Sequence, residues 1–223
     1  MQATRAEQAP SFVKRLPAVG KAYRFAARCH SGQRRESDEA AFIVHPLEVG
    51  ALLDATGSPE HVIVAGVLHD VLEKTAATPQ EIRRAFGSRI ASLVLALTED
   101  PAIEPFEARK AALRAQISAE GPAAGAISAA DHVTKVRELR TRIAQARGRG
   151  EADPPDGERK LDHYVASLET LEGQIPEHPL VRQLRFELET LDALPPGAQP
   201  VDGGLGPGNP LGQPDGAGEA GEG

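Results

Sequence analysis

An imidazole and two carboxylates lie within five residues of one another at the end of a strongly apolar segment. His69 and Asp70 follow the run Val-Ile-Val-Ala-Gly-Val-Leu, and Glu73 comes one turn later. If the segment is helical, the three side chains share one face. Polar or ionised groups in such surroundings are costly unless they are paired or bind a metal. A metal ion here, with a carboxylate that positions water, would suit hydrolysis.

Two further residues fit the same site. His45 stands immediately before a proline at the start of an expected helix, and Asp131 follows the apolar run Ala-Ile-Ser-Ala-Ala. With His69 and Asp70 they offer two imidazoles and two carboxylates from three helices. Such a mixed set suits Mn, Fe, Mg or Zn with room for water better than a closed structural zinc site. A lone His-Asp pair is more often structural, but this combination favours a metal.

The elements that position these residues are predicted to be helices. Apolar residues recur at helical spacing, Thr78 and Glu81 stand at capping-box spacing, and no long stretch alternates as a strand would. The pattern predicts an all-α fold. The expected helices span about 17–31, 46–55, 59–74, 79–86, 88–97, 105–119, 122–146, 157–173 and 178–192.

The composition bounds the organisation of the chain. It has 223 residues, 40% of them hydrophobic, which fits one ordinary globular domain. We expect a loose N-terminus over 1–10 and a catalytic domain over 11–192. Residues 193–223 hold ten Gly and six Pro, so we expect a disordered tail without a further catalytic segment.

Charge and cysteine content restrict the partners and the compartment. The formal charge is -7; four acidic residues and no Lys or Arg lie after residue 193, so the remaining chain carries -3. Without a basic excess we expect no nucleic-acid partner, and without an apolar run of about 20 residues no membrane partner. The single cysteine fits a reducing cytoplasm. The oligomeric state stays open.

As an ordered set, several motifs between residues 17 and 145 resemble the HD-domain hydrolases of the RelA/SpoT type, especially the small stand-alone alarmone hydrolases. The matching segments are Phe-Ala-Ala with His30, Gly-Gln-Arg-Arg at 32–35, Phe-Ile-Val-His-Pro-Leu-Glu-Val at 42–49, Leu-His-Asp-Val-Leu-Glu at 68–73, Thr-x-x-Glu-Ile-x-x-x-Phe-Gly at 78–87, and Ala-Asp at 130–131. The resemblance implies an HD-domain helical bundle with one divalent ion, usually Mn²⁺. It also implies removal of the 3′-pyrophosphate of (p)ppGpp.

Carried over residue by residue, the resemblance makes His45, His69, Asp70 and Asp131 the metal ligands. Glu73 becomes the acid that orients or deprotonates the attacking water. A nucleotide is the substrate that the resemblance implies.

The resemblance also assigns a substrate shell. Arg35 matches a basic residue that stacks on the guanine, and Lys110 matches a substrate-binding lysine. Arg34 would bind a base or a phosphate together with Arg35, although a solvated loop is an equal alternative.

Three positions depart from the family pattern. Lys74 replaces a second catalytic acid, Glu36 replaces a basic residue, and Lys135 replaces an asparagine. Lys74 and Lys135 would contact substrate phosphates, or would only form helical ion pairs with the acids four residues before them. The departures leave two alternatives open: an HD-type hydrolase of another nucleotide or phosphate ester, and a nucleotide-binding module with little turnover.

Overall fold

The computed structural model describes residues 9–193, and within them the chain is entirely helical apart from loops and one isolated bridge between Arg34 and Ala41. The predicted all-α fold is confirmed. The helices are α1 (Ser11–Arg15), α2 (Pro17–Cys29), α3 (Val44–Ala55), α4 (Glu60–Leu68), α5 (Val71–Lys74), α6 (Pro79–Phe86), α7 (Ser88–Ala96), α8 (Phe106–Glu120), α9 (Pro122–Gly148), α10 (Gly157–Gln174) and α11 (Pro179–Asp192).

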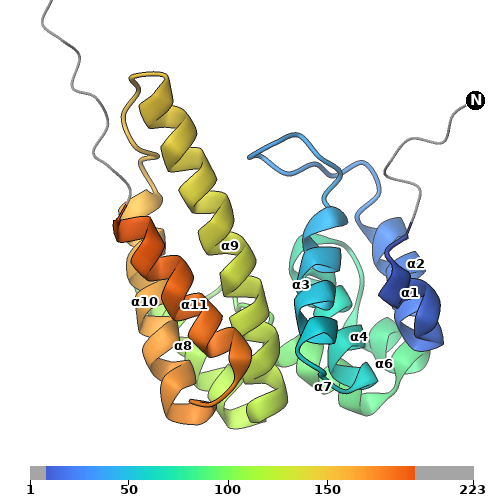
Figure 1. The fold of residues 1–223 in the computed structure, drawn as a ribbon. Coiled ribbons are helices and arrows are strands. Elements are labelled where there is room, and N and C mark those ends of the chain that lie inside the picture. Colours follow the sequence, from blue (N-terminus) through green and yellow to red (C-terminus); the bar gives the residue numbers. More distant parts are fainter. Residues whose placement is uncertain (1–8, 194–223) are drawn as a thin grey trace, which may run out of the picture.

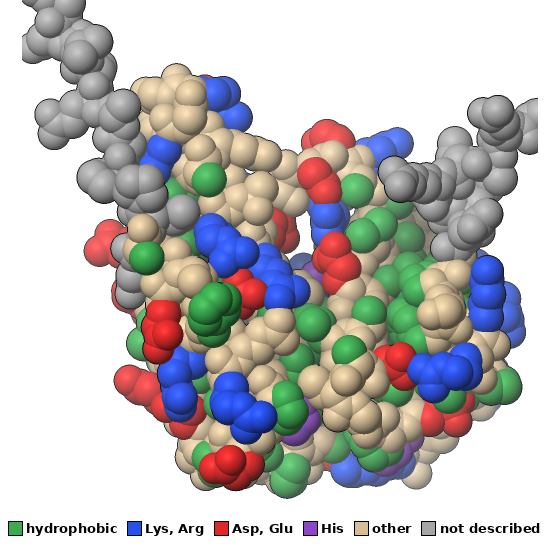
Figure 2. Space-filling view, viewed as in Figure 1, with side chains coloured by type: hydrophobic (Ala, Val, Ile, Leu, Met, Phe, Trp, Pro, Cys, Tyr) green, Lys and Arg blue, Asp and Glu red, His purple; other side chains and the backbone are tan. Residues whose placement is uncertain are grey.

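The long helix α9 joins two groups of helices (Figure 1). On one side it packs against α3 and α4 of the N-terminal group, and on the other against α8, α10 and α11. Figure 2 shows the surface hollowed between the upper part of α9 and the segment that leads into α3, with acidic and basic side chains around the hollow. Residues distant in sequence therefore meet where α3, α4 and α9 come together.

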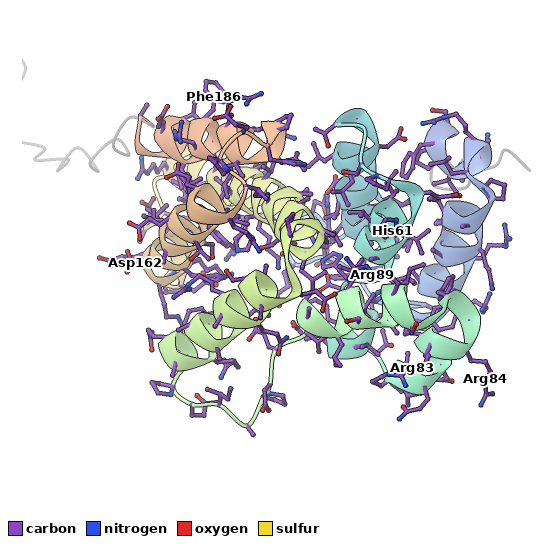
Figure 3. The ribbon with its side chains drawn as sticks, turned by 90° about the horizontal axis from the view of Figure 1, so that it is seen from below. His61, Arg83, Arg84, Arg89, Asp162 and Phe186 are labelled. Carbon is purple, nitrogen blue, oxygen red and sulfur yellow. The ribbon has the colours of Figure 1, made fainter. Side chains whose placement is uncertain are left out.

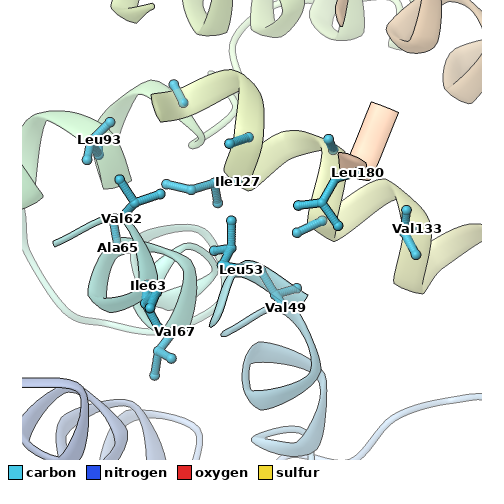
Figure 4. Packing of buried hydrophobic residues seen from close by; sticks show 14 of the residues in the cluster. Val49, Leu53, Val62, Ile63, Ala65, Val67, Leu93, Ile127, Val133 and Leu180 are labelled. Carbon is cyan, nitrogen blue, oxygen red and sulfur yellow. The ribbon is translucent and has the colours of Figure 1, made fainter. Parts of the chain in front are cut away.

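The core at this junction is aliphatic, as the low aromatic content requires. Leu53 of α3, Ile63 of α4 and Ile127 of α9 are at most 2% exposed. Figure 4 shows Leu53 close to Ile127, and Ile63 beside Val67 on α4. Burial of such side chains, each worth about 1.5–3 kcal/mol, fixes the backbones that carry the polar residues beside them.

Helices α3 and α4 pack tightly at Gly66. A Cβ atom there would collide with Leu53 Cδ1, and Leu53 is fully buried, so it has little room to move. We expect Gly66→Ala to lower the free energy of unfolding by about 1–3 kcal/mol because it overpacks the core. Gly173→Ala is the matched control, since no atom lies near its Cβ position, and it should be neutral or stabilising. Urea denaturation of both variants checks this, and equal effects would contradict it.

The structure differs from the sequence prediction in three places. The expected helix over 59–74 is interrupted: α4 ends at Leu68 and α5 begins at Val71. The cause is local. In a continuing helix the Gly66 carbonyl would accept a hydrogen bond from the main-chain N–H of Asp70. Here it accepts one from the His69 ring instead, at 2.8 Å. In addition, α3 begins two residues early, so that His45 lies in its first turn, and α1 was not predicted.

The predicted tail lies outside the described residues except for Ala193, as does most of the N-terminus predicted to be loose. Within residues 9–193, no helix combines the length and the hydropathy that a bilayer crossing requires.

Candidate metal centre

Four side chains from three parts of the chain converge at the junction of α3, α4 and α9. His45 Nε2 lies 3.3 Å from His69 Nε2, 3.4 Å from Asp70 Oδ2 and 3.2 Å from Asp131 Oδ1. His69 Nε2 lies 3.4 Å from Asp70 Oδ2 and 3.5 Å from Asp131 Oδ1. All four residues are buried, with 8% exposure at most. The structure thus brings together the four residues predicted as metal ligands.

Two of the converging oxygen atoms have no hydrogen-bond partner among the described residues. They are Asp70 Oδ2 and Asp131 Oδ1, and both are buried. A buried acceptor without a partner costs about 1–3 kcal/mol, and more when it is charged. Two carboxylate oxygens and two imidazole nitrogens facing one point are a donor set that a divalent cation satisfies. The residues present therefore fit a metal ion.

The pKa shifts in the cluster also fit a cation at this place. Burial alone would lower the pKa of His69, but the Asp70 and Asp131 carboxylates outweigh it and raise that pKa to about 9. Burial would raise the pKa of Asp131, yet the Lys135 ammonium and the His69 imidazole hold it well below its usual value. At neutral pH and without a metal, His69 therefore carries a proton in the place that a cation would take.

This protonation predicts how the stability of the metal-free protein depends on pH. Because the pKa of His69 is raised from 6.5 to about 9 in the folded protein, its contribution is complete below pH 6.5 and is lost as the pH rises to 9. We expect the free energy of unfolding in a chelator to fall by about 3 kcal/mol over that range. Denaturant titrations at several pH values measure it. His69→Asn should flatten the profile, whereas replacement of the exposed His61 should not; a flat wild-type profile would contradict the account.

A cavity of about 360 Å³ opens beside the cluster. Every residue predicted to act on the substrate lines this cavity. His45 and Asp70 reach its wall, and the predicted residues that also line it are Arg34, Arg35, Glu73, Lys74, Lys110 and Lys135. Glu36, which departs from the family pattern, lines it as well.

The two arginines of the loop before α3 are held by acceptors of that loop and of α3. Arg35 pairs with Asp38 and, at 2.9 Å, with Glu48, and these pairs raise its pKa. Arg34 donates to the main-chain carbonyl of Glu39 at 2.6 Å. Both guanidinium groups are therefore oriented before any ligand binds, and base stacking by Arg35 stays a prediction.

The three lysines are also paired with carboxylates. Lys135 Nζ lies 2.7 Å from Asp131 Oδ2, and Lys74 Nζ lies 3.9 Å from Asp70 Oδ1, so both form the helical pairs weighed from the sequence. Lys110 pairs with Glu99. Their pairing and their place in the cavity wall are compatible, because an ammonium group has three donors.

Glu73 lines the cavity and has a third of its side chain exposed. Its Oε1 lies 3.6 Å from Lys74 Nζ, and its Oε2 accepts a hydrogen bond from the main-chain N–H of Glu99 at 3.5 Å. The carboxylate is thus within the cavity and reachable by water.

Sequence reasoning missed part of the cavity lining, which α8, α9, α10 and the loop between α7 and α8 supply. These residues follow no motif spacing, and only the packing of these elements brings them to the cavity. They are Glu99, Phe106, Glu138, Leu139, Arg142, Lys160, His163 and Tyr164.

Figure 3 gives the view from below, in which Arg83 and Arg84 of α6 project outward at the edge of the molecule.

Comparisons with known sequences show which proteins this chain resembles. The profile of the HD domain family matches residues 22–151. A GTP pyrophosphokinase of Myxococcus xanthus is 44% identical over 84 residues, 38% of this chain and 11% of that protein. The guanosine-3′,5′-bis(diphosphate) 3′-pyrophosphohydrolase of Aquifex aeolicus is 41% identical over 81 residues, 36% of this chain and 12% of that protein. The chain spans only a small part of these relatives.

Two solved structures share the fold. A metazoan orthologue of SpoT that hydrolyses ppGpp superposes with a TM-score of 0.65 at 24% identity, covering 84% of this chain and 99% of that one. The protein lmo0812 of Listeria monocytogenes superposes with a TM-score of 0.57 at 25% identity, covering 67% of this chain and 94% of that one. With the profile match over more than half of its length, the chain belongs to the HD domain family.

Proposed function

We propose that this protein is a metal-dependent phosphohydrolase that acts on guanosine 3′,5′-bis(diphosphate)-type alarmones and releases pyrophosphate from the 3′ position. The observation that carries the proposal is the pair of unpartnered carboxylate oxygens, facing two imidazole nitrogens beside a cavity with several cationic residues. The name of the relative from Aquifex aeolicus supports the substrate class.

His45, His69, Asp70 and Asp131 would hold one divalent ion, with Mn²⁺ expected first and Fe, Mg or Zn as other candidates. When bound, such an ion would neutralise charge on the phosphoryl group as a Lewis acid. The adjacent ammonium of Lys135 binds the outer oxygen of Asp131 and limits the negative charge around the reacting group.

The remaining residues bind and orient. The Glu73 carboxylate takes a proton from the water that attacks the phosphorus atom next to the 3′ oxygen. The bond between that phosphorus and the 3′ oxygen breaks, the 3′ oxygen takes up a proton from the Glu73 carboxyl group or from water, and guanosine 5′-diphosphate and pyrophosphate are released. Lys74, Lys110 and Lys135 bind phosphate oxygens.

Arg34 and Arg35, which also line the cavity, bind the nucleotide. Arg35 has only 16% of its side chain exposed and is fixed by two carboxylates, so it presents a planar group at little cost in conformational entropy. A planar guanidinium group of this kind stacks on a purine base.

One observation favours a second function. Lys74 Nζ lies 3.6 Å from Glu73 Oε1, and an ammonium there competes with water for that carboxylate. The protein would then bind a nucleotide with little turnover, or act on another nucleotide or phosphate ester whose charge Lys74 contacts.

The purified protein, supplied with Mn²⁺, is to be screened against (p)ppGpp and a panel of nucleotides, with phosphate and pyrophosphate measured separately. We expect pyrophosphate from (p)ppGpp, and its loss in Glu73→Ala. Binding of (p)ppGpp without product would favour the binding module. Release of phosphate from another nucleotide would favour the alternative substrate.

A further inference from the structure

The hydroxyl group of Thr134 joins two of the clustered residues. Thr134 lies on α9 one turn after Asp131 and is 8% exposed. Its Oγ1 donates to the main-chain carbonyl of Asp131 at 2.8 Å and lies 3.2 Å from Nδ1 of His45. A hydroxyl has a single proton, and here the carbonyl takes it. The oxygen is therefore the acceptor toward His45, and His45 Nδ1 carries the hydrogen.

This bond decides which atom of His45 faces the cluster. With its proton on Nδ1, neutral His45 has its lone pair on Nε2, the atom that lies 3.2 Å from Asp131 Oδ1 and 3.3 Å from His69 Nε2. The His69 ring is held in the same way, since its Nδ1 lies 2.8 Å from the Gly66 carbonyl. A histidine that binds a metal through one nitrogen almost always donates from the other, which fixes its ring.

We propose that Thr134 is a positioning residue that fixes the ring and the tautomer of His45 for binding a divalent cation. The inference rests on the proposed metal site. Three residues in one turn of α9 would then contribute to the site. Asp131 supplies a donor oxygen, Thr134 orients His45 of α3, and Lys135 binds the second oxygen of Asp131 at 2.7 Å. The hydroxyl thereby ties together two donors from distant parts of the chain.

The first test measures cation affinity. Thr134→Val keeps the side-chain shape and removes the hydroxyl, so the affinity of the full chain for Mn²⁺, measured by calorimetric titration, should fall about 10–100-fold. Thr134→Ser should stay close to wild type. Thr141→Val is the matched control, because Thr141 lies two turns further along α9 and, within residues 9–193, its hydroxyl bonds only to the carbonyl of Arg137. Equal losses in the two valine variants would overturn the proposal.

A double-mutant cycle separates positioning from general disruption. In a His45→Ala background, Thr134→Val should cause no further loss of Mn²⁺ affinity. A further loss as large as in the wild-type background would show that Thr134 acts by another route, and would overturn the proposal.

The second readout needs no metal. Long-range ¹H–¹⁵N correlation spectra of the metal-free protein should show a slowly exchanging proton on His45 Nδ1, which exchanges quickly with solvent in Thr134→Val. A bare Nδ1 in wild-type protein that still binds Mn²⁺ would overturn the role of Thr134 alone. A wild-type protein that binds no divalent cation would overturn the proposed metal site and this role together.

Discussion

Replacement of His69 by alanine is expected to reduce the affinity for Mn²⁺ by more than about 100-fold, beyond the effect of an outer contact. His69 Nε2 lies within 3.5 Å of three other donor atoms of the cluster, and its ring is 4% exposed. Removing it leaves one imidazole and two carboxylates whose charges then face each other without the proton that His69 carries.

His61→Ala is the control for this variant. His61 lies in the first turn of α4 and is exposed (Figure 3), so its replacement should leave Mn²⁺ affinity unchanged. Calorimetric titration of both variants, with thermal denaturation as a check of folding, makes the comparison. An unchanged affinity in a folded His69→Ala protein would place the cation elsewhere.

Lys74→Asp is expected to raise the rate of (p)ppGpp hydrolysis, starting from a slow wild-type rate. Lys74 Nζ lies 3.6 Å from Glu73 Oε1, and both side chains line the cavity and are about one third exposed. An ammonium cannot accept the proton of that water, while a carboxylate can help to orient it. One carboxylate in general acid–base catalysis is worth about 10²–10⁴-fold in rate, so partial recovery is measurable.

The comparison needs wild type, Lys74→Asp and the inactive control Glu73→Ala, assayed together with Mn²⁺ and pyrophosphate as the readout. Lys14→Asp makes the same charge change at an exposed position of α1 and controls for net charge. Fast wild-type hydrolysis that Lys74→Asp leaves unchanged or lowers would show that the lysine is compatible with the reaction. Hydrolysis by neither protein would favour another substrate or a binding module.

The parts of the fold that local chemistry decides were predictable from the sequence. The capping box at Thr78 and Glu81 starts α6, since Thr78 N–H donates to Glu81 Oε2 at 2.8 Å and its hydroxyl accepts from Glu81 N–H. The same holds for the proline-initiated helices α2 and α9. The HD-domain prediction, made from an ordered set of motifs, is confirmed.

The break at His69 and Asp70 was not predictable from periodicity. The apolar pattern continues through this point, and the helix is interrupted where the His69 ring bonds to the Gly66 carbonyl. The metal-binding geometry itself depends on that break, because the two residues leave the regular helix where they meet His45 and Asp131.

The residues that contact the four clustered side chains or line the cavity around them could also not be predicted from the sequence. Nothing in the spacing of Thr134 indicates a partner in α3, because that contact depends on how α3 packs against α9. Tyr164 and Lys160 reach the cavity for the same reason, since the packing of α10 on α9 decides which of its faces lines the cavity.

The central claim is that four side chains hold one divalent cation, and anomalous scattering at the manganese edge tests it most directly. Crystals of the full chain grown with Mn²⁺ should show one strong anomalous peak between His45 Nε2, His69 Nε2, Asp70 Oδ2 and Asp131 Oδ1, the atoms that now converge. No peak at saturating Mn²⁺, or a peak held by other residues alone, would contradict the account.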